Sequence, residues 1–398
     1  MLLHNARIVL SDRTLDNADV LVAGDRIASI FERPAAPLDH HESVIDLTGL
    51  TLFPGFIDVH IHGSVGVDTM ETDSAGLHEI SEFLAGQGVT AWLPTLVPAP
   101  VAEYKRAIEA IEELVAQTLV CDPDPNQHRL KSVPHARVLG VHYEGPFVNS
   151  AQCGALHKEH FRSFINVAEL DELPVVRRSG VSHMMTLAPE IDGGIELIKE
   201  LKRRSWVVSI GHTRAEIEVL DRALAAGARH LTHFMNAMTP LHHRTLGVAG
   251  WGLIRNEVTC DLIADGIHIN PAILTLLVNN KTAERISLIS DAIAAAGKGD
   301  GEYQIWGETI EVRDGRTRNQ HGNIAGSVIS ILDAVRLMLT LGFSESDVAR
   351  MAATNPAGLL GIDEECGSIA VGKRADLVAL DEQLKVRATI IGGNVFRY

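Results

Sequence analysis

The chain has 398 residues, a length that suits one large domain and one small one. Its formal net charge of −16 argues against a nucleic-acid-binding surface, because phosphate backbones require clustered lysine and arginine. No apolar run is long enough to cross a membrane, and the first residues lack the charged start, apolar core and cleavage site of a signal peptide. We therefore expect a cytoplasmic protein that uses neither nucleic acid nor a membrane as partner.

Four cysteines, Cys121, Cys153, Cys260 and Cys366, are scattered along the chain without a close pair. This spacing favours reduced thiols over a disulfide framework or a zinc ribbon. The cysteines therefore agree with a cytoplasmic compartment.

Both ends of the chain are predicted to form short strands. Residues 1–52 contain apolar runs separated by turn signals such as Ala23–Asp25, and residues 361–398 have the same texture around Gly392. Neither end has enough apolar residues for a core of its own. We expect the two ends to pair into one small β-sandwich domain, which leaves residues 53–360 as the second domain.

Between these ends, predicted strands alternate with predicted helices, the pattern of parallel βαβ units. Eight strands are expected, at Phe56–His62, Thr90–Leu96, Arg137–Glu144, His183–Ala188, Trp206–His212, His230–Phe234, Thr259–Ala264 and Ile286–Asp291. Eight such units predict an α/β fold of the (β/α)8 TIM-barrel type, typically about 250 residues before insertions. A doubly wound open sheet is the alternative, but no Gly-rich dinucleotide loop follows any of these strands.

Chemistry in such a barrel lies where the strands end at their C-terminal face. Histidines and carboxylates fall at five of the eight predicted strand ends: His60 with His62, Glu144, His212, His233 and Asp291. Any one of them alone could be a capping residue or a packed core residue. Together, histidines, a carboxylate and an open position form the ligand set of a catalytic metal that activates water. The pattern therefore indicates metal-assisted hydrolysis, without naming a substrate.

Short motifs surround these residues, at Pro54–His62, Val141–Phe147, Thr186–Glu190, Ile210–Thr213, Leu231–Met238, Ala264–His268 and Ile289–Ala292. They resemble the amidohydrolase superfamily and, within it, the N-acetylglucosamine-6-phosphate deacetylase family, over essentially the whole chain. The tail Gly367–Leu377 is shared by many amidohydrolases and is less specific. The resemblance implies removal of the acetyl group from N-acetylglucosamine 6-phosphate, giving glucosamine 6-phosphate and acetate. It also implies a homodimer.

The resemblance also implies a ligand set. Carried over position by position, Glu144, His212 and His233 hold the principal metal, and some family members bind a second metal through the positions of His60 and His62. One or two divalent metals per subunit are therefore both open. Zinc is the first choice, and iron, cobalt or manganese would suit the same ligands.

Further roles follow from the same resemblance. Asp291 matches the catalytic aspartate, which acts as general base and then as general acid. Asn236 and Ala237, together with Arg244 and His268, match the groups that bind the sugar phosphate.

Two departures from the family pattern touch substrate choice. The family commonly has a substrate-binding histidine where this chain has Leu156, and His157 falls one position late. Either a local shift restores His157 to the site or Leu156 faces the sugar. After Arg244, Thr245-Leu246 replaces the usual Glu-Pro. The conformation of the loop around Arg244 is therefore open.

Three alternatives remain at this stage. One is a deacetylase of another N-acetyl hexosamine, either an epimer or a sugar without phosphate. Another is a different amidohydrolase, although many cyclic-amide hydrolases use a modified lysine where this chain has Glu144. The third is a metal-free assembly protein on the same fold, which the intact strand-end residues disfavour.

Overall fold

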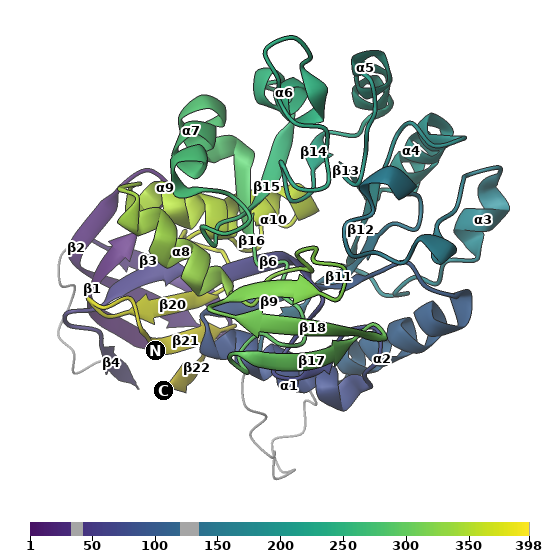
Figure 1. Ribbon diagram of the computed structural model, residues 1–398. Helices are drawn as coiled ribbons and strands as arrows, with labels where there is room; N and C mark the ends of the chain where they lie inside the picture. Colours follow the sequence, from purple (N-terminus) through teal and green to yellow (C-terminus); the bar gives the residue numbers. More distant parts are fainter. Residues whose placement is uncertain (33–42, 120–134, 398) are drawn as a thin grey trace.

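The computed structural model describes residues 1–32, 43–119 and 135–397. Its centre is a sheet of parallel strands that curves into a barrel (Figure 1). The barrel strands, in the order in which neighbours pair, are β6 (Phe56–Ile61), β9 (Val89–Leu96), β11 (Gly140–Glu144), β12 (Ser182–Leu187), β13 (Val207–Ile210), β14 (His230–Leu231), β15 (Thr259–Ile263) and β16 (Ile286–Ile289). A short strand, β10 (Arg137–Val138), pairs beside β9. The predicted TIM-type barrel is confirmed.

The barrel closes between its last strand and its first. Here an isolated parallel bridge joins Ile61 to Ala292, and the N–H of Asp291 donates to the carbonyl of His60 at 2.9 Å. Closure of the sheet therefore depends on the residues that follow β16 and carry part of the predicted site.

Helices cover the outside of the barrel (Figure 1). They are α1 (Ser74–Gly86), α2 (Val101–Leu119), α3 (Val167–Asp171), α4 (Gly194–Arg203), α5 (Ile217–Ala226), α6 (Gly247–Ile254), α7 (Pro271–Lys281), α8 (Ile331–Thr340), α9 (Glu345–Ala349) and α10 (Asn355–Leu360). Side chains alternate along the strands, so that Trp92 and Leu262 belong to one buried cluster and Leu93 and Ile263 to another. Because both faces are covered, the strands read as near-continuous apolar runs. None of the helices in the described ranges has the length and apolar character needed to cross a lipid bilayer.

The two ends of the chain form a second, mixed sheet. Its strands are β1 (Leu2–Val9), β2 (Thr14–Ala23), β3 (Arg26–Phe31), β4 (Val44–Asp46), β5 (Thr51–Pro54), β20 (Leu377–Leu380), β21 (Val386–Ile391) and β22 (Asn394–Arg397). The ends meet where β20 pairs antiparallel with β5, with Ala379 opposite Leu52. The predicted pairing of the two termini is confirmed, whereas the division into domains at residues 52 and 361 stays a prediction.

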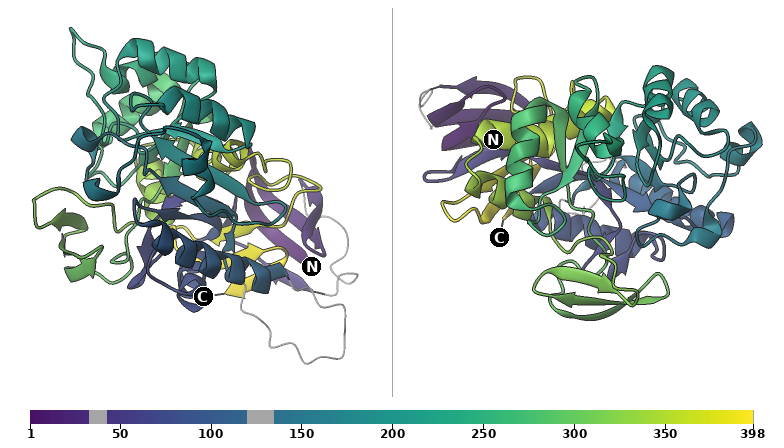
Figure 2. Two further views of the ribbon diagram at one scale, coloured as in Figure 1. Left: turned by 90° about the vertical axis from the view of Figure 1, so that its right-hand side faces the viewer. Right: turned by 45° about the horizontal axis from the view of Figure 1, so that its top comes forward.

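A small antiparallel sheet follows β16 and was not expected from the sequence. It consists of β17 (Gly301–Ile305), β18 (Glu308–Arg313) and β19 (Arg316–Asn319), and it projects from the barrel (Figure 2). A further short hairpin, β7 (Gly63–Ser64) with β8 (Val67–Asp68), follows the first barrel strand. Both additions lie at strand ends, where they can shape the mouth of the barrel.

Three of the four cysteines lie in the described part of the chain. Cys153, Cys260 and Cys366 are free, and Cys121 lies outside the described residues. Burial raises the pKa of Cys260 to about 12 and that of Cys366 to about 11, so both stay protonated.

Candidate active site

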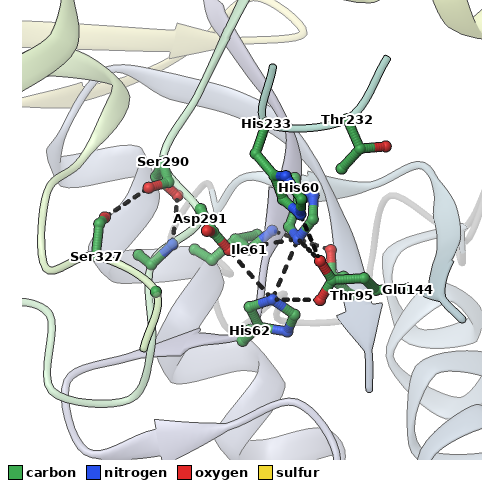
Figure 3. Close-up of polar contacts among 12 residues, drawn as sticks. His60, Ile61, His62, Thr95, Glu144, Thr232, His233, Ser290, Asp291 and Ser327 are labelled. Carbon is green, nitrogen blue, oxygen red and sulfur yellow. Dashed lines mark hydrogen bonds and ion pairs between the residues drawn. The ribbon is translucent and has the colours of Figure 1, made fainter. Parts of the chain in front are cut away.

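The predicted strand-end residues come together in one buried cluster. His60 lies in β6 and His62 follows it, Glu144 ends β11, and His233 and Asp291 each lie two residues beyond their strands. Figure 3 shows these five side chains facing one another at the mouth of the barrel. His212, two residues beyond β13, contacts the same carboxylate. Each of the six residues is at most 8% exposed.

The backbone bends sharply to bring three of these side chains inward. His212, His233 and Asp291 have φ angles of 47°, 33° and 51°, in the left-handed region. Such conformations cost on the order of 1–3 kcal/mol each and persist only where the surrounding structure imposes them. The fold therefore holds these residues in positions that the isolated chain would not favour.

Glu144, His212 and His233 form the first candidate metal cluster. Oε1 of Glu144 lies 2.9 Å from Nε2 of each histidine, and the two Nε2 atoms are 3.1 Å apart. Nδ1 of His212 lies 2.8 Å from the carbonyl oxygen of Gln152, to which it can donate, so that the lone pair of the neutral ring is on Nε2. Two ligands of a tetrahedral zinc are about 3.3 Å apart, so this donor set fits such an ion.

His60, His62 and the same Glu144 form the second cluster. The Nε2 atoms of the two histidines are 3.1 Å apart, and that of His62 lies 3.3 Å from Oε2 of Glu144. Oδ1 of Asp291 is 3.4 Å from Nε2 of His60 and 3.3 Å from Nε2 of His62. Glu144 thus stands between two histidine pairs, and Asp291 lies on the side of the His60 pair.

The charges in the cluster oppose the effect of burial. Burial alone would raise the pKa of Glu144, but His60, His212 and His233 hold it well below its usual value. Burial also acts to raise the pKa of Asp291, but His60 and His62 lower it below its usual value. Without a cation, protons on the imidazoles must balance these two carboxylates. A divalent metal can take the place of those protons, since histidine and carboxylate ligands bind metals in their deprotonated forms.

A buried histidine supports the first strand from inside the barrel. His142 packs against His60 with ring centroids 4.7 Å apart and lies 3.0 Å from the carbonyl oxygen of Val59. Its other nitrogen lies 2.8 Å from the hydroxyl of Thr186, which in turn contacts Thr232 at 2.6 Å. Burial lowers the pKa of His142 well below its usual value, so the ring is neutral.

A cavity of about 490 Å³ opens onto the cluster. Asn236, Ala237 and His268, three of the predicted phosphate-binding residues, are part of its lining. Nδ1 of His268 lies 2.6 Å from Oδ2 of Asp265, which directs its Nε2 away from that carboxylate.

The two remaining predicted substrate residues lie elsewhere. Leu156 belongs to the cavity lining, whereas His157 does not, and Nδ1 of His157 lies 3.3 Å from Oε1 of Glu159. Arg244 is exposed in the loop before α6 and is also outside the lining. Of the two arrangements left open for the 154–157 loop, the structure has the one with Leu156 at the cavity.

Several residues of the site carried no role in the sequence analysis. Gln152 acts through its backbone carbonyl, which no side-chain pattern reveals. Trp306, from the unexpected small sheet, lines the cavity. Glu190 accepts hydrogen bonds from the side chains of Asn149 and Thr213 and from the N–H of Arg214, at 2.6–2.7 Å. The motif that contains Glu190 is recognisable in the sequence, but only the structure shows that Glu190 joins the loop of Asn149 to the loop of Thr213.

Comparison with known proteins places this site in a family. Residues 51–396 match the amidohydrolase family model. The chain is 36% identical to the N-acetylgalactosamine-6-phosphate deacetylase of Escherichia coli O157:H7, over 99% of this chain and 98% of the relative. It is 34% identical to the N-acetylglucosamine-6-phosphate deacetylase of Bacillus subtilis (strain 168), over 99% of this chain and 96% of the relative.

A solved structure gives the same result for the fold. A variant of the N-acetyl-D-glucosamine-6-phosphate deacetylase from Mycobacterium smegmatis, in complex with N-acetyl-D-glucosamine 6-phosphate, superposes with a TM-score of 0.86. The two chains are 30% identical, and the match covers 99% of this chain and 98% of the other. The chain therefore belongs to the amidohydrolase family and, within it, to the N-acetylglucosamine-6-phosphate deacetylases.

Proposed function

We propose that this enzyme hydrolyses the acetamide of N-acetylglucosamine 6-phosphate, giving glucosamine 6-phosphate and acetate. The observation that carries the proposal is the pair of histidine clusters around Glu144, with Asp291 beside them and the cavity in front. Full-length relatives with this activity support the choice of substrate.

Glu144, His212 and His233 would hold the principal metal, with zinc as our first choice, and His60 and His62 could hold a second ion with Glu144. A metal bound there would polarise a carbonyl and make the attacking water more acidic. The clusters themselves do not specify which divalent metal is used, because such ligands accept several.

Asp291 is proposed as the group that moves the proton. Its carboxylate, kept ionised by His60 and His62, accepts a proton from the attacking water as the oxygen bonds to the carbonyl carbon. The C–N bond then breaks, and Asp291 returns the proton to the departing amine. The products are acetate and the free amino sugar, so atoms and protons balance without another reactant.

The substrate's phosphate is proposed to lie at Asn236, Ala237 and His268. The contact with Asp265 fixes the orientation of the His268 ring, whose Nε2 would face the phosphate. Binding the phosphate at a distance from the reacting carbonyl would fix the position of the acetamide, which is how remote contacts increase turnover.

A second candidate substrate is the galacto epimer. The relative from Escherichia coli acts on N-acetylgalactosamine 6-phosphate and is 36% identical to this chain. Leu156, at the cavity where the family pattern has a histidine, is a second observation in favour of an altered sugar preference.

A screen tests these assignments. Metal-free protein, reloaded with zinc, would be assayed on N-acetylglucosamine, N-acetylgalactosamine and N-acetylmannosamine, each with and without a 6-phosphate. We expect the highest kcat/KM on N-acetylglucosamine 6-phosphate and no turnover without metal. A preference for an unphosphorylated sugar, or turnover by the metal-free protein, would contradict the proposal.

A homodimer is part of the proposal. Leu241, Ile254 and Leu276 are 51%, 61% and 54% exposed, on or next to the neighbouring helices α6 and α7, and exposed apolar side chains of this kind suit a protein interface. Arg244 lies in the loop that contains Leu241, so a second subunit packed there would contact the loop that carries Arg244. Sedimentation analysis tests the dimer itself.

Mixed dimers test the role of Arg244. Arg244→Ala and Asp291→Asn variants would be combined, with each variant alone as control. If Arg244 binds phosphate in the partner's cavity, the mixture regains activity, because one cavity of the mixed dimer has both groups. If Arg244 acts within its own subunit, the mixture stays as inactive as the separate variants.

A cytoplasmic location is also proposed, because a charged sugar phosphate does not cross a lipid bilayer unaided.

A further inference from the structure

Trp306 occupies a turn position that rarely holds a bulky side chain. Ile305 pairs with Glu308 across the β17–β18 hairpin, so Trp306 and Gly307 form its two-residue turn. Their φ angles are 53° and 75°, as in a type I′ turn, where Asn, Asp or Gly is preferred at the first position. A bulky residue with positive φ is an outlier, and such outliers cluster at functional sites.

The indole of Trp306 is held in place from two sides. Its Nε1 donates to Oδ2 of Asp68 at 2.9 Å, and its ring stands at 85° to that of His62 with centroids 5.3 Å apart. Asp68 is buried, and it also accepts a hydrogen bond from the N–H of Met70. The hairpin therefore presents a fixed aromatic surface beside His62, a proposed metal ligand.

Trp306 and the proposed phosphate-binding residues lie on different sides of Glu144. On one side, Trp306 contacts His62, which faces Oε2 of Glu144. On the other side, His233 faces Oε1, and Asn236 donates to the carbonyl of His233 at 3.2 Å.

This arrangement has a consequence for the acetamide. The nitrogen and the methyl group of an amide leave the carbonyl carbon in different directions, about 120° apart because that carbon is planar. A sugar that extends from the nitrogen toward Asn236 directs the methyl group toward the opposite wall. That wall includes Trp306 and Ile324, both part of the cavity lining. Ala155, also in the lining, packs against the same apolar cluster as Trp306.

We propose that Trp306, with Ile324, forms the pocket for the acyl methyl group and limits the length of the acyl chain that the enzyme removes. The inference rests on the proposed deacetylase function and adds a specificity-determining wall to that site. An apolar wall suits a methyl group because its burial is favourable and no polar partner is needed.

The test is an acyl series on glucosamine 6-phosphate: N-formyl, N-acetyl, N-propionyl and N-butyryl. We expect wild-type protein to prefer the acetyl compound over the butyryl compound. Trp306→Ala should raise the ratio of kcat/KM for butyryl over acetyl by at least about 10- to 200-fold, the range for one methylene in an apolar pocket, because butyryl is two methylenes longer than acetyl. Trp306→Phe should give a smaller shift in the same direction.

Tyr303→Ala is the matched control. Tyr303 is on the same hairpin, its hydroxyl donates to the carbonyl of Gly299 at 2.8 Å, and it is not among the residues that line the cavity. This variant perturbs the hairpin without changing the wall, so it should keep the wild-type acyl ratio.

The outcomes separate this inference from the proposed function. A wild-type acyl ratio in Trp306→Ala, at full metal content, would overturn the inference alone. If Trp306→Ala loses its metal or its cooperative unfolding, Ile324→Ala becomes the test of the inference. Ile324→Ala should also raise the ratio of kcat/KM for the butyryl compound over the acetyl compound. Failure of wild-type protein to hydrolyse any member of the series would overturn the proposed function and this inference together.

Discussion

The hydroxyl of Ser290 donates a hydrogen bond of 2.5 Å to Oδ2 of Asp58, and this bond joins the residue that follows the last barrel strand to the first strand. Oδ1 of Asp58 accepts from the N–H groups of His60 and Ser290, each at 3.3 Å. Burial raises the pKa of Asp58 to about 6, although the Ser290 hydroxyl lowers it in part. The barrel thus closes through a buried carboxylate next to the residues that carry the site.

Removing the hydroxyl should therefore destabilise the protein in a pH-dependent way. A hydrogen bond to a charged group contributes about 1.5–3 kcal/mol, so Ser290→Ala should lower the free energy of unfolding by that amount well above pH 6. The bond favours the ionised form of Asp58, and the variant therefore has the higher folded-state pKa. The difference between the two proteins must then shrink as the pH falls from the variant's higher pKa to about 6, and it should stay constant at lower pH, where Asp58 is protonated in both.

Urea unfolding of the metal-free proteins at pH 5 and pH 8 measures this effect. Ser179→Ala, at an exposed position, is the control and should change little. If Ser290→Ala lowers the free energy of unfolding equally at both pH values, the contribution of this hydrogen bond does not depend on an ionised Asp58.

Asp291→Asn should separate chemistry from metal binding. The amide keeps the size of the side chain but cannot accept the proton, so we expect turnover to fall by about two to four orders of magnitude. Metal content should stay at the wild-type level, because Glu144 and the histidines remain. Steady-state kinetics combined with elemental analysis tests both statements, and turnover within a few-fold of wild type would exclude Asp291 as the base.

The two histidine pairs should not be equivalent. His212→Ala or His233→Ala removes one of the three ligands of the principal cluster, and we expect loss of metal and of activity. The double change His60→Ala with His62→Ala should be milder if one metal suffices. Metal titration of all three proteins gives the answer, and a double variant as empty and inactive as His212→Ala would reverse the ranking of the clusters.

Glu190 is expected to position His212 from a distance. It accepts hydrogen bonds from the hydroxyl of Thr213 and from the side chain of Asn149. The backbone N–H of Asn149 in turn donates to the carbonyl of His212 at 3.0 Å. Outer residues of this kind change metal affinity by about 10- to 100-fold, so Glu190→Gln should weaken zinc binding within that range. Competition with a chelator measures the Kd, and Glu196→Gln on α4 serves as the control. Unchanged affinity would reduce Glu190 to a structural role.

The barrel and its cluster were predictable because each has a local signature. A parallel strand covered on both faces reads as a near-continuous apolar run, and Val207–Ile210 and Ile286–Ile289, each interrupted by a single serine, show one. Once the strands are predicted, the candidate functional side chains are those at the strand ends, because the active sites of such barrels lie there. Neither step requires knowledge of distant contacts.

The remaining features depend on contacts that the sequence does not encode locally. The ring of Trp306 meets His62 across a long separation in the chain, and its turn position would ordinarily indicate a surface residue. The Gln152 carbonyl that orients His212 belongs to the backbone and has no residue signature. His157 and Arg244 were assigned by resemblance alone, and a one-residue shift in one loop suffices to exchange His157 for Leu156 at the cavity.

The sheet built from both termini has a consequence during synthesis. Strand β5 pairs with β1 on one side and with β20 on the other, and β20 leaves the ribosome only after the whole barrel. Until then, the nascent chain carries one edge of β5 with unpaired N–H and C=O groups, and such edges pair readily with other chains. Synthesis that stops before Leu377 should therefore yield an aggregating product rather than a shorter enzyme.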